Sequence, residues 1–227
     1  MLGALATVTT RIRLGPLVSP VTFRLPALLA KMAVTLDHTS GGRAVLGVGA
    51  GGLAEEHHRF GLPFGSSAER ASRLDESVGT IRSLLETGQP RPVQARIPIL
   101  IGGAGQRTLA IAAAHADMWN AILLPLAFAE KAAALRSLAA ARGRDVMATA
   151  SFRIIVRDRR EQIDERLADL HTVWREDPYR VEGTVTEVTA RLREYVRAGA
   201  NGLIVQMPAP VDFETLERLA GEIRTAV

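Results

Sequence analysis

The chain has 227 residues, of which 47 % are hydrophobic and 23 % charged, and its formal net charge is +4 at pH 7. These are ordinary values for a globular protein that is long enough to bury a large core. The sequence contains no cysteine, which excludes disulfide scaffolds, thiolate metal sites and cysteine nucleophiles. Its apolar runs are shorter than the roughly 18 residues of a membrane span, and the first basic residues follow an apolar stretch instead of preceding it. We therefore expect a cytoplasmic protein with no membrane contact.

The isoelectric point of about 10.2 comes almost entirely from arginine, since only Lys31 and Lys131 among the 28 basic residues are lysines. The arginines alternate with acidic residues, as in the RDRRE stretch at residues 157–161. Such mixing is typical of solvated helix faces and not of a basic stripe that follows phosphates. The few, scattered aromatic residues also offer no platform for stacking bases. We expect no nucleic-acid partner.

Short apolar runs alternate along the chain with longer helical patterns. The runs are rich in Ile, Val and Leu, as in parallel strands that are buried on both faces. They predict strands at residues 12–18, 44–48, 98–101, 118–124, 151–156 and 202–206. The helical patterns predict a first helix from Pro26 to the glycine pair at 41–42 and a second over residues 74–85, which ends at Gly88. Another helix is predicted after a capping box formed by Thr184 and Glu187. The remaining helices are predicted over residues 109–116, 126–141, 163–174 and 213–223.

Six strand–helix alternations predict an α/β protein with a parallel sheet. No linker-like stretch divides the sequence, so we expect residues 1–227 to form one domain. Such chains close as barrels or form open sheets, and residues 47–52 (GVGAGG) match the bare glycine pattern of a dinucleotide-binding turn. A lone match of this kind is weak evidence, and its position after the second strand instead of the first counts against it.

Three stretches together resemble the luciferase-like monooxygenase superfamily, which includes coenzyme F420-dependent oxidoreductases and FMN-dependent monooxygenases. They are residues 9–52 with TLDHTSGGR, residues 98–120 with GGAG and ADMWN, and the capped helix within residues 183–203. The resemblance implies a TIM-type (β/α)8 barrel with the cofactor at the carboxyl ends of the strands. The strand at residues 12–18 resembles the third strand of that family. We therefore expect an incomplete barrel of about six units that lacks the first two.

The glycine-rich stretch after the strand at residues 98–101 is the strongest candidate for a binding site. Gly102, Gly103, Ala104 and Gly105 leave that strand, and a helix is expected to start near Gln106. Glycines let the backbone approach a phosphate closely, and the first N–H groups of a helix attract it. The resemblance implies that this turn holds the phosphate of F420 or FMN. A tight turn without a ligand is the alternative.

The resemblance assigns further residues to the ring of the cofactor. It implies a non-proline cis peptide at Leu17–Val18 beside the ring, Ala50 and Gly51 along the ring plane, and Glu55 near the ring edge. The alternatives are an ordinary buried pair for Leu17 and Val18 and a solvated acid for Glu55.

No catalytic residue can be assigned from the sequence. The sugar-phosphate dehydrogenase branch of the family has an acid at the position of Gly52, so that acid is missing here. We interpret His57 and His58 as a surface pair of which at most one faces the site. No metal site is expected, because His38, His115 and His171 have no partner at metal-ligand spacing. We expect Phe60 and Phe64 to make apolar contacts in the core or in a lid, and Trp119 to pack in the interior. Arg43 and Asp117 are expected to anchor turns.

The resemblance implies an oxidoreductase that transfers hydride between F420, or alternatively reduced FMN, and a small organic substrate. The cofactor would supply the chemistry while the protein orients it and excludes water. The arginine-rich composition favours F420 slightly. A cofactor-binding protein without turnover and a phosphosugar-handling barrel are the alternatives. Because an incomplete barrel leaves strand edges and apolar surface unpaired, we expect a homo-oligomer.

Overall fold

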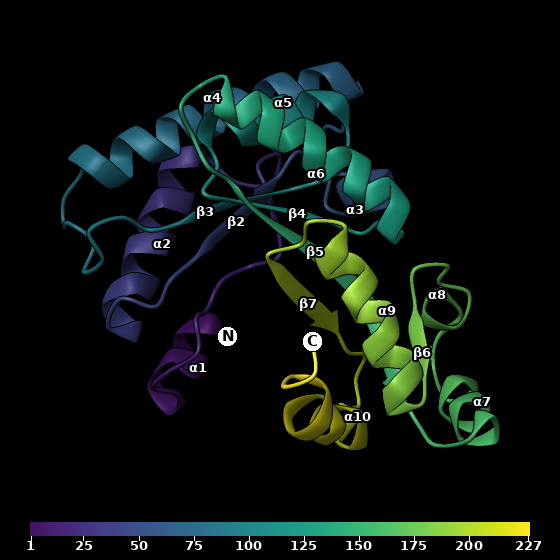
Figure 1. Cartoon of the computed structure of the whole chain (residues 1–227). Helices are drawn as coiled ribbons and strands as arrows, with labels where there is room; N and C mark the ends of the chain where they lie inside the picture. Colours follow the sequence, from purple (N-terminus) through teal and green to yellow (C-terminus); the bar gives the residue numbers. More distant parts are fainter. The chain divides into compact units, whose positions relative to one another are not determined.

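The computed structural model describes residues 1–227, apart from the side chains of Val173 and Trp174. The chain divides into two compact units, a first unit of residues 1–119 and 135–146 and a second unit of residues 120–134 and 147–227 (Figure 1). Both combine parallel strands with helices, which confirms the predicted α/β class. The expectation of a single domain stays a prediction. Within the described residues, no helix is both long enough and apolar enough to cross a membrane.

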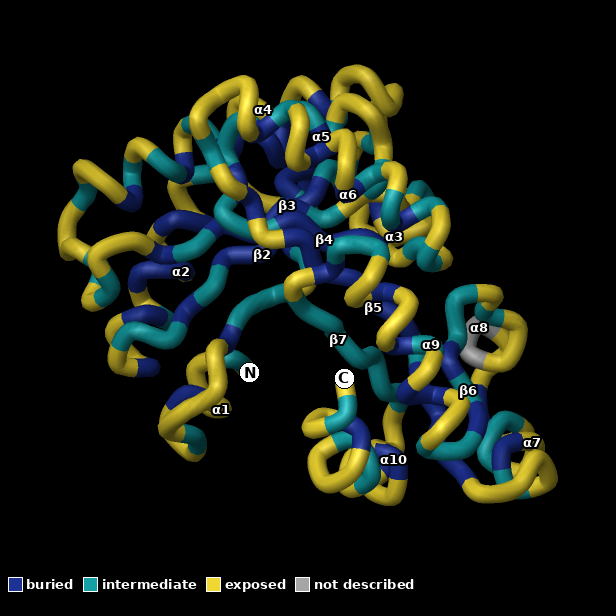
Figure 2. The backbone as a smooth tube through the Cα atoms, in the orientation of Figure 1, coloured by how far each residue is buried: buried dark blue, intermediate teal, exposed yellow. Residues whose placement is uncertain are grey.

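The strands of the first unit follow the order β1-β2-β3-β4. They are β1 (Ser19–Pro20), β2 (Leu46–Gly49), β3 (Ile99–Gly102) and β4 (Met118–Ala121), the last of which continues into the second unit. β1 pairs with β2, and β2 with β3, in parallel register. Figure 2 shows β2 and β3 as buried segments beneath helices whose outer faces are exposed. Parallel strands buried on both faces are expected from their apolar sequences.

The strand predicted over residues 12–18 is wrong. In this segment only Leu14 forms a bridge, with Ala44, and the ladder begins later, at Ser19. Pro16 has no N–H group to donate to a neighbouring strand. The backbone of Gly15 also approaches Val45 so closely that a Cβ on Gly15 would lie 2.0 Å from the Val45 carbonyl oxygen. The segment therefore runs beside the start of β2, with backbone hydrogen bonds at Leu14 only, and forms no continuous ladder before Ser19.

The helices predicted for the first unit are present, although one begins at Ser67 instead of residue 74 and the short helix at Ala54–Arg59 was not predicted. They are α1 (Leu2–Val8), α2 (Pro26–Ser40), α3 (Ala54–Arg59), α4 (Ser67–Thr87), α5 (Gln106–His115) and the end of α6 (Pro125–Ala140). Pro26 occupies the first turn of α2, and Gly41 ends it in a left-handed conformation with φ of 64°. Ser66 and Glu69 form a capping box before α4. The helical spacing of apolar residues predicted for α4 is confirmed, because the side chains at this spacing are buried. They are Leu74, Val78, Ile81 and Leu85.

Two charged side chains anchor turns in the first unit, as predicted. Arg43 donates hydrogen bonds to the Ala6 and Thr9 carbonyl oxygens and so fastens α1 to the turn before β2. Asp117 accepts hydrogen bonds from Arg82, at 2.6 Å, and from the Ile99 amide, at 2.8 Å. Burial opposes ionisation of Asp117, but these hydrogen bonds outweigh it and lower its pKa.

In the second unit, β5 (Met147–Val156) pairs in parallel with β6 (Val181–Gly183) and with β7 (Gly202–Gln206). β7 has the predicted bounds, whereas β6 was not predicted and raises the number of strands to seven. The helices are the start of α6, α7 (Arg160–Ala168), α8 (Thr172–Arg175), α9 (Val185–Arg197) and α10 (Phe213–Arg218), the last followed by a π-helical turn over Leu219–Ile223. The helix predicted over residues 163–174 is thus divided, and its last two side chains lie outside the described residues. The predicted capping box of Thr184 and Glu187 starts α9.

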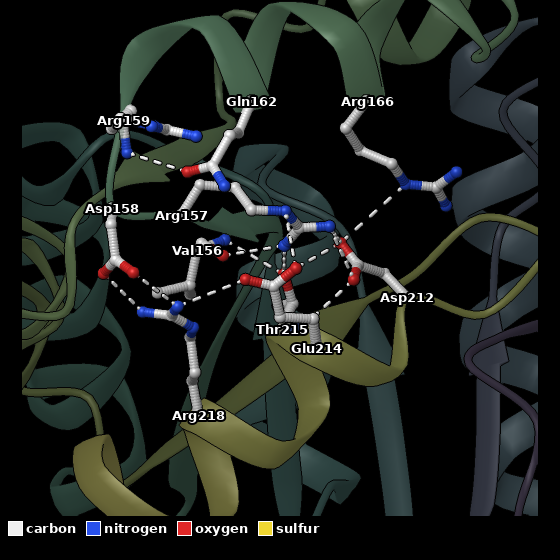
Figure 3. A network of polar contacts seen from close by, with 10 residues as sticks. All are labelled: Val156, Arg157, Asp158, Arg159, Gln162, Arg166, Asp212, Glu214, Thr215 and Arg218. Carbon is white, nitrogen blue, oxygen red and sulfur yellow. Dashed lines mark hydrogen bonds and ion pairs between the residues drawn. The ribbon is translucent and has the colours of Figure 1, made fainter.

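A buried ion pair fastens α10 to the end of β5 (Figure 3). Nη2 of Arg157 donates to both carboxylate oxygens of Asp212, at 2.9 Å and 3.0 Å. Asp212 also caps α10 by accepting from the amide and hydroxyl of Thr215. Burial opposes ionisation of Asp212, but the hydrogen bonds from Arg157 and Thr215 outweigh it and lower its pKa.

We expect this carboxylate to make the second unit less stable in acid. Because the pKa of Asp212 is lower in the folded than in the unfolded chain, its contribution is complete above the unfolded pKa of about 3.9. It is lost as the pH falls through the lower folded pKa. Asp212→Asn removes this titration and keeps an oxygen that can cap Thr215. Urea unfolding followed by circular dichroism, from roughly pH 5 to pH 2, should therefore show a steeper loss of unfolding free energy in the wild type. Equal slopes would contradict the assignment.

Candidate functional site

A cavity of about 1250 Å³ opens in the first unit at the carboxyl ends of β2 and β3. Its wall includes Val18, the segment after β2, residues 102–105, and one face of α2. The last pair of the β2–β3 ladder, Gly49 and Gly102, lies at this edge. In parallel α/β proteins, the loops after the strands converge at this end, where binding sites form.

Residues 102–105, which we call the glycine turn, lead from β3 into α5. Gly103 has a φ of +127°, and a Cβ on it would lie 3.3 Å from Cγ2 of Thr108. Gly105 occupies the N-cap position of α5, and no side chain caps this end of the helix. Because the first N–H groups of a helix have no partner within it, an uncapped N-terminus facing a cavity can bind an anion.

The indole of Trp119 supports the glycine turn from the interior. Trp119 is fully buried, and its Nε1–H donates a 2.8 Å hydrogen bond to the Gly103 carbonyl oxygen. This agrees with the packing role predicted for Trp119. It also fixes the peptide plane that precedes Ala104, so the N–H groups of the turn keep one orientation.

Val18 fills the space between the ends of β2 and β3. A Cβ on Gly49 would lie 2.8 Å from Cγ2 of Val18, and a Cβ on Gly102 would lie 3.0 Å from Cγ1 of Val18. The two glycines thus admit the Val18 side chain to the wall of the cavity. The peptide bond between Leu17 and Val18 is cis, as the family resemblance implies.

The interpretation of His57 as a surface residue is wrong. Its side chain is buried, whereas His58 is exposed. The neighbouring phenylalanines also differ, because Phe64 packs edge-on against His57 and Phe60 is 62 % exposed. Spacing along α3 indicates that at most one histidine can face inward but does not say which.

Most of the residues predicted for the cofactor site line the cavity. They are Val18, Ala50, Gly51, Gly102, Gly103, Ala104 and Gly105. Leu17, Glu55 and Gln106 are not among the described lining residues. Glu55 is exposed, and its neighbour Glu56 contributes to the wall instead. The contacts of all these residues with a cofactor stay predictions.

Three basic residues of the wall were not predicted from the sequence. Arg24, Lys31 and Arg70 line the cavity, while Glu56 is the one acid among its described lining residues. The guanidinium of Arg70 stacks 3.8 Å above the ring of Phe64 and donates to the Gly65 carbonyl oxygen. This surplus of positive charge favours an anionic ligand. No local pattern distinguishes these residues from the many solvated arginines of the chain.

Comparisons with known proteins agree with this geometry. A family model described as luciferase-like monooxygenase matches residues 1–221. An uncharacterized protein of Mycobacterium tuberculosis (strain ATCC 25618 / H37Rv) is 34 % identical over 161 aligned positions, which cover 63 % of this chain and 56 % of that protein. The chain thus spans little more than half the length of this relative.

Solved structures show the same fold. The coenzyme F420-dependent tetrahydromethanopterin reductase from Methanopyrus kandleri superposes with a TM-score of 0.79 at 21 % identity, covering 99 % of this chain and 86 % of that chain. A riboflavin lyase with modified FMN and riboflavin gives a TM-score of 0.80 at 15 % identity, with coverages of 99 % and 72 %. The predicted fold class, that of the luciferase-like TIM-type barrels, is confirmed. Since the family model extends over both units and the fold agrees with it, this chain belongs to the luciferase-like monooxygenase family.

Proposed function

We propose that the chain binds coenzyme F420, or FMN in its place, in the cavity of the first unit. In this proposal the chain is an oxidoreductase that transfers hydride between the cofactor and a small organic substrate. The observation that carries the proposal is the glycine turn, which leads into an uncapped helix N-terminus at the wall of a large cavity. Membership of a family with F420- and FMN-dependent members supports it.

The residues of the cavity fit the phosphate that both cofactors carry. A side chain on Gly103 would press against Thr108, so the bare backbone leaves room at the turn. The N–H groups at the start of α5 would donate to phosphate oxygens, and the helix dipole would favour the negative charge. Arg24, Lys31 and Arg70 would add positive charge around it. This surplus suits F420 in particular, because its tail carries carboxylates in addition to the phosphate.

Other residues of the wall would orient the ring of the cofactor. Val18 and Gly51 provide an apolar wall near the ends of β1 and β2. Such a surface excludes water from a reacting carbon and strengthens electrostatic interactions there. When bound, the cofactor would supply the hydride donor or acceptor, while the chain orients the cofactor and excludes water from it.

Separate titrations with F420 and with FMN, followed by ligand fluorescence and thermal shift, test this proposal. We expect saturable binding of one cofactor, in the micromolar range at about −8 kcal/mol, together with a raised melting temperature. Absence of binding by both cofactors would refute the proposal. Substrate-dependent turnover by the chain would in turn remove the alternative of a cofactor-binding protein without activity.

The variant Gly105→Asp should separate binding from stability. Gly105 has φ of −66° and ψ of 148°, which any residue can adopt, and its Cβ would meet only Oγ1 of Thr108, at 3.7 Å. An aspartate at the N-cap stabilises a helix by about 1 kcal/mol, but its carboxylate would occupy and repel the proposed phosphate site. We therefore expect an unchanged or higher melting temperature and at least about tenfold weaker cofactor binding.

Gly105→Ala is the matched control, since it adds a Cβ without charge or cap. It should retain most of the affinity in the same fluorescence titration. Equal affinities of the aspartate variant and the wild type would show that the phosphate does not bind at α5.

A further inference from the structure

A buried polar pair lies directly behind the cavity wall. The side chain of His57, on α3, is 1 % exposed, and that of Thr22 is 4 % exposed. Nδ1 of His57 is 2.7 Å from the Leu53 carbonyl oxygen, and Nε2 is 2.8 Å from Oγ1 of Thr22. A carbonyl oxygen can only accept, so Nδ1 carries the proton in the neutral ring and Nε2 accepts from the Thr22 hydroxyl. Both polar ends of the imidazole are therefore satisfied.

The pair touches the cavity wall through Gly51. This glycine has a φ of +83°, and a Cβ on it would lie 2.6 Å from Oγ1 of Thr22 and 3.1 Å from Cε1 of His57. Gly51 itself lines the cavity, whereas neither Thr22 nor His57 is among the described lining residues. One glycine backbone thus separates the polar pair from the space that a ligand would fill.

Two aromatic rings pack against the imidazole. Phe23 and Phe64 meet His57 edge-on, with ring centroids at 4.8 Å and 4.9 Å. Phe23 also lines the cavity. The segment that carries Thr22 is tied to the end of β2, because the Val21 amide donates a 3.0 Å hydrogen bond to the Gly49 carbonyl oxygen. The imidazole therefore has a defined place from which to hold Gly51.

We propose that His57 and Thr22 are positioning residues that hold Gly51 at the cavity wall and thereby set the affinity for the cofactor ring. The proposal rests on the proposed function, since it assumes that a flavin-type ring contacts this wall. The hydrogen bond between Thr22 and His57 keeps the hydroxyl against the backbone of Gly51. Without that bond, the hydroxyl turns away and residues 50–52 lose their support. Neither side chain touches the ligand.

Variants at Thr22 test the hydrogen bond with little change in shape. Thr22→Val replaces the hydroxyl by a methyl group and leaves Nε2 of His57 without a donor. We expect it to weaken binding of F420 or FMN about tenfold, because ligand binding must then restore the order of residues 50–52 at a cost similar to that of one hydrogen bond. Thr22→Ser restores the hydroxyl and should bind within about twofold of the wild type. His58→Phe changes the exposed neighbour and serves as the control with unchanged affinity.

A double variant separates positioning from a merely structural role. Thr22→Val combined with His57→Phe replaces both polar partners by apolar groups, which is often nearly neutral for stability. We expect its melting temperature to return toward that of the wild type while cofactor binding stays about tenfold weaker. If affinity returned together with stability, the pair would be structural only and the proposal would be overturned.

Amide hydrogen exchange of residues 50–52 in the cofactor-free protein gives a second readout. The exchange should be faster in Thr22→Val than in Thr22→Ser, since only the former loses the support. Equal exchange rates would overturn the positioning role. If the wild type bound neither cofactor, the proposed function would fail, while the exchange rates would still decide whether the pair positions Gly51. If the wild type bound a cofactor and Thr22→Val bound it equally well, only the present inference would fail.

Discussion

Replacing Arg157 by methionine is expected to lower the unfolding free energy of the second unit by about 3–5 kcal/mol. The side chains of Arg157 and Asp212 are 10 % and 5 % exposed. Methionine would fill much of the space of the arginine stem, but it would leave the Asp212 carboxylate buried without its main counter-charge. Arg166 keeps an ion pair with that carboxylate at 3.8 Å, but this distance is beyond hydrogen bonding, so Arg166 compensates the lost partner only in part.

The same substitution at an exposed ion pair is the matched control. Arg160 is more than half exposed and binds Asp164 across one turn of α7 and Glu182 of β6. Because Glu182 keeps Arg180 as a partner, Arg160→Met should cost at most about 1 kcal/mol. The double variant Arg157→Met, Asp212→Asn removes the uncompensated charge and should regain part of the lost stability. Urea unfolding followed by circular dichroism measures all three. A loss at Arg157 no larger than that at Arg160 would contradict the buried-pair interpretation.

Gly47→Ala is expected to prevent stable folding of the first unit. A Cβ at this position would lie 2.0 Å from the Pro16 carbonyl oxygen and 3.3 Å from Cγ1 of Val18. The contact is with backbone, and Gly47 is held on its other side by pairing with Leu100 of β3. β2 and Pro16 would have to separate, which costs about 3 kcal/mol, the upper end of the usual range for overpacking.

Gly52→Ala provides the comparison for this prediction. A Cβ on Gly52 would meet no atom within 4 Å, so its effect should stay within about 0.5 kcal/mol. Thermal melting followed by circular dichroism distinguishes the two variants. Similar melting temperatures would show that the close approach of Pro16 to β2 is not required. Two glycines of the stretch that matches a dinucleotide-binding pattern, Gly47 and Gly49, serve here to let the Pro16 backbone and the Val18 side chain approach the strand.

Local sequence patterns predicted those parts of the fold that depend on local interactions. β7 was predicted with its observed bounds, because a run of apolar residues follows closely on a helix that ends at Arg197. The start of α9 follows directly from the capping box of Thr184 and Glu187. The glycine turn was also found, since a strand, three glycines and a helix start adjoin one another in the sequence.

Features that depend on distant partners were not predictable in this way. β6 has three residues around Glu182, too few to show a periodicity, and it exists because β5 offers a free edge. The burial of His57 depends on Thr22, which lies 35 positions away. The role of Arg70 in the cavity wall likewise depends on folding of α4 beside the glycine segments, and one arginine among 28 basic residues gives no sign of it.

The hydrogen bond from Trp119 to Gly103 has an optical consequence. Its indole is buried beside the turn that would hold a flavin or deazaflavin, and such rings absorb light in the range in which tryptophan emits. Energy transfer falls steeply with separation, so a ligand in the cavity should quench Trp119 far more than a tryptophan elsewhere. Replacing the other tryptophan, Trp174, by phenylalanine would leave Trp119 as the single tryptophan. The chain therefore carries its own label-free fluorescent reporter of cofactor occupancy.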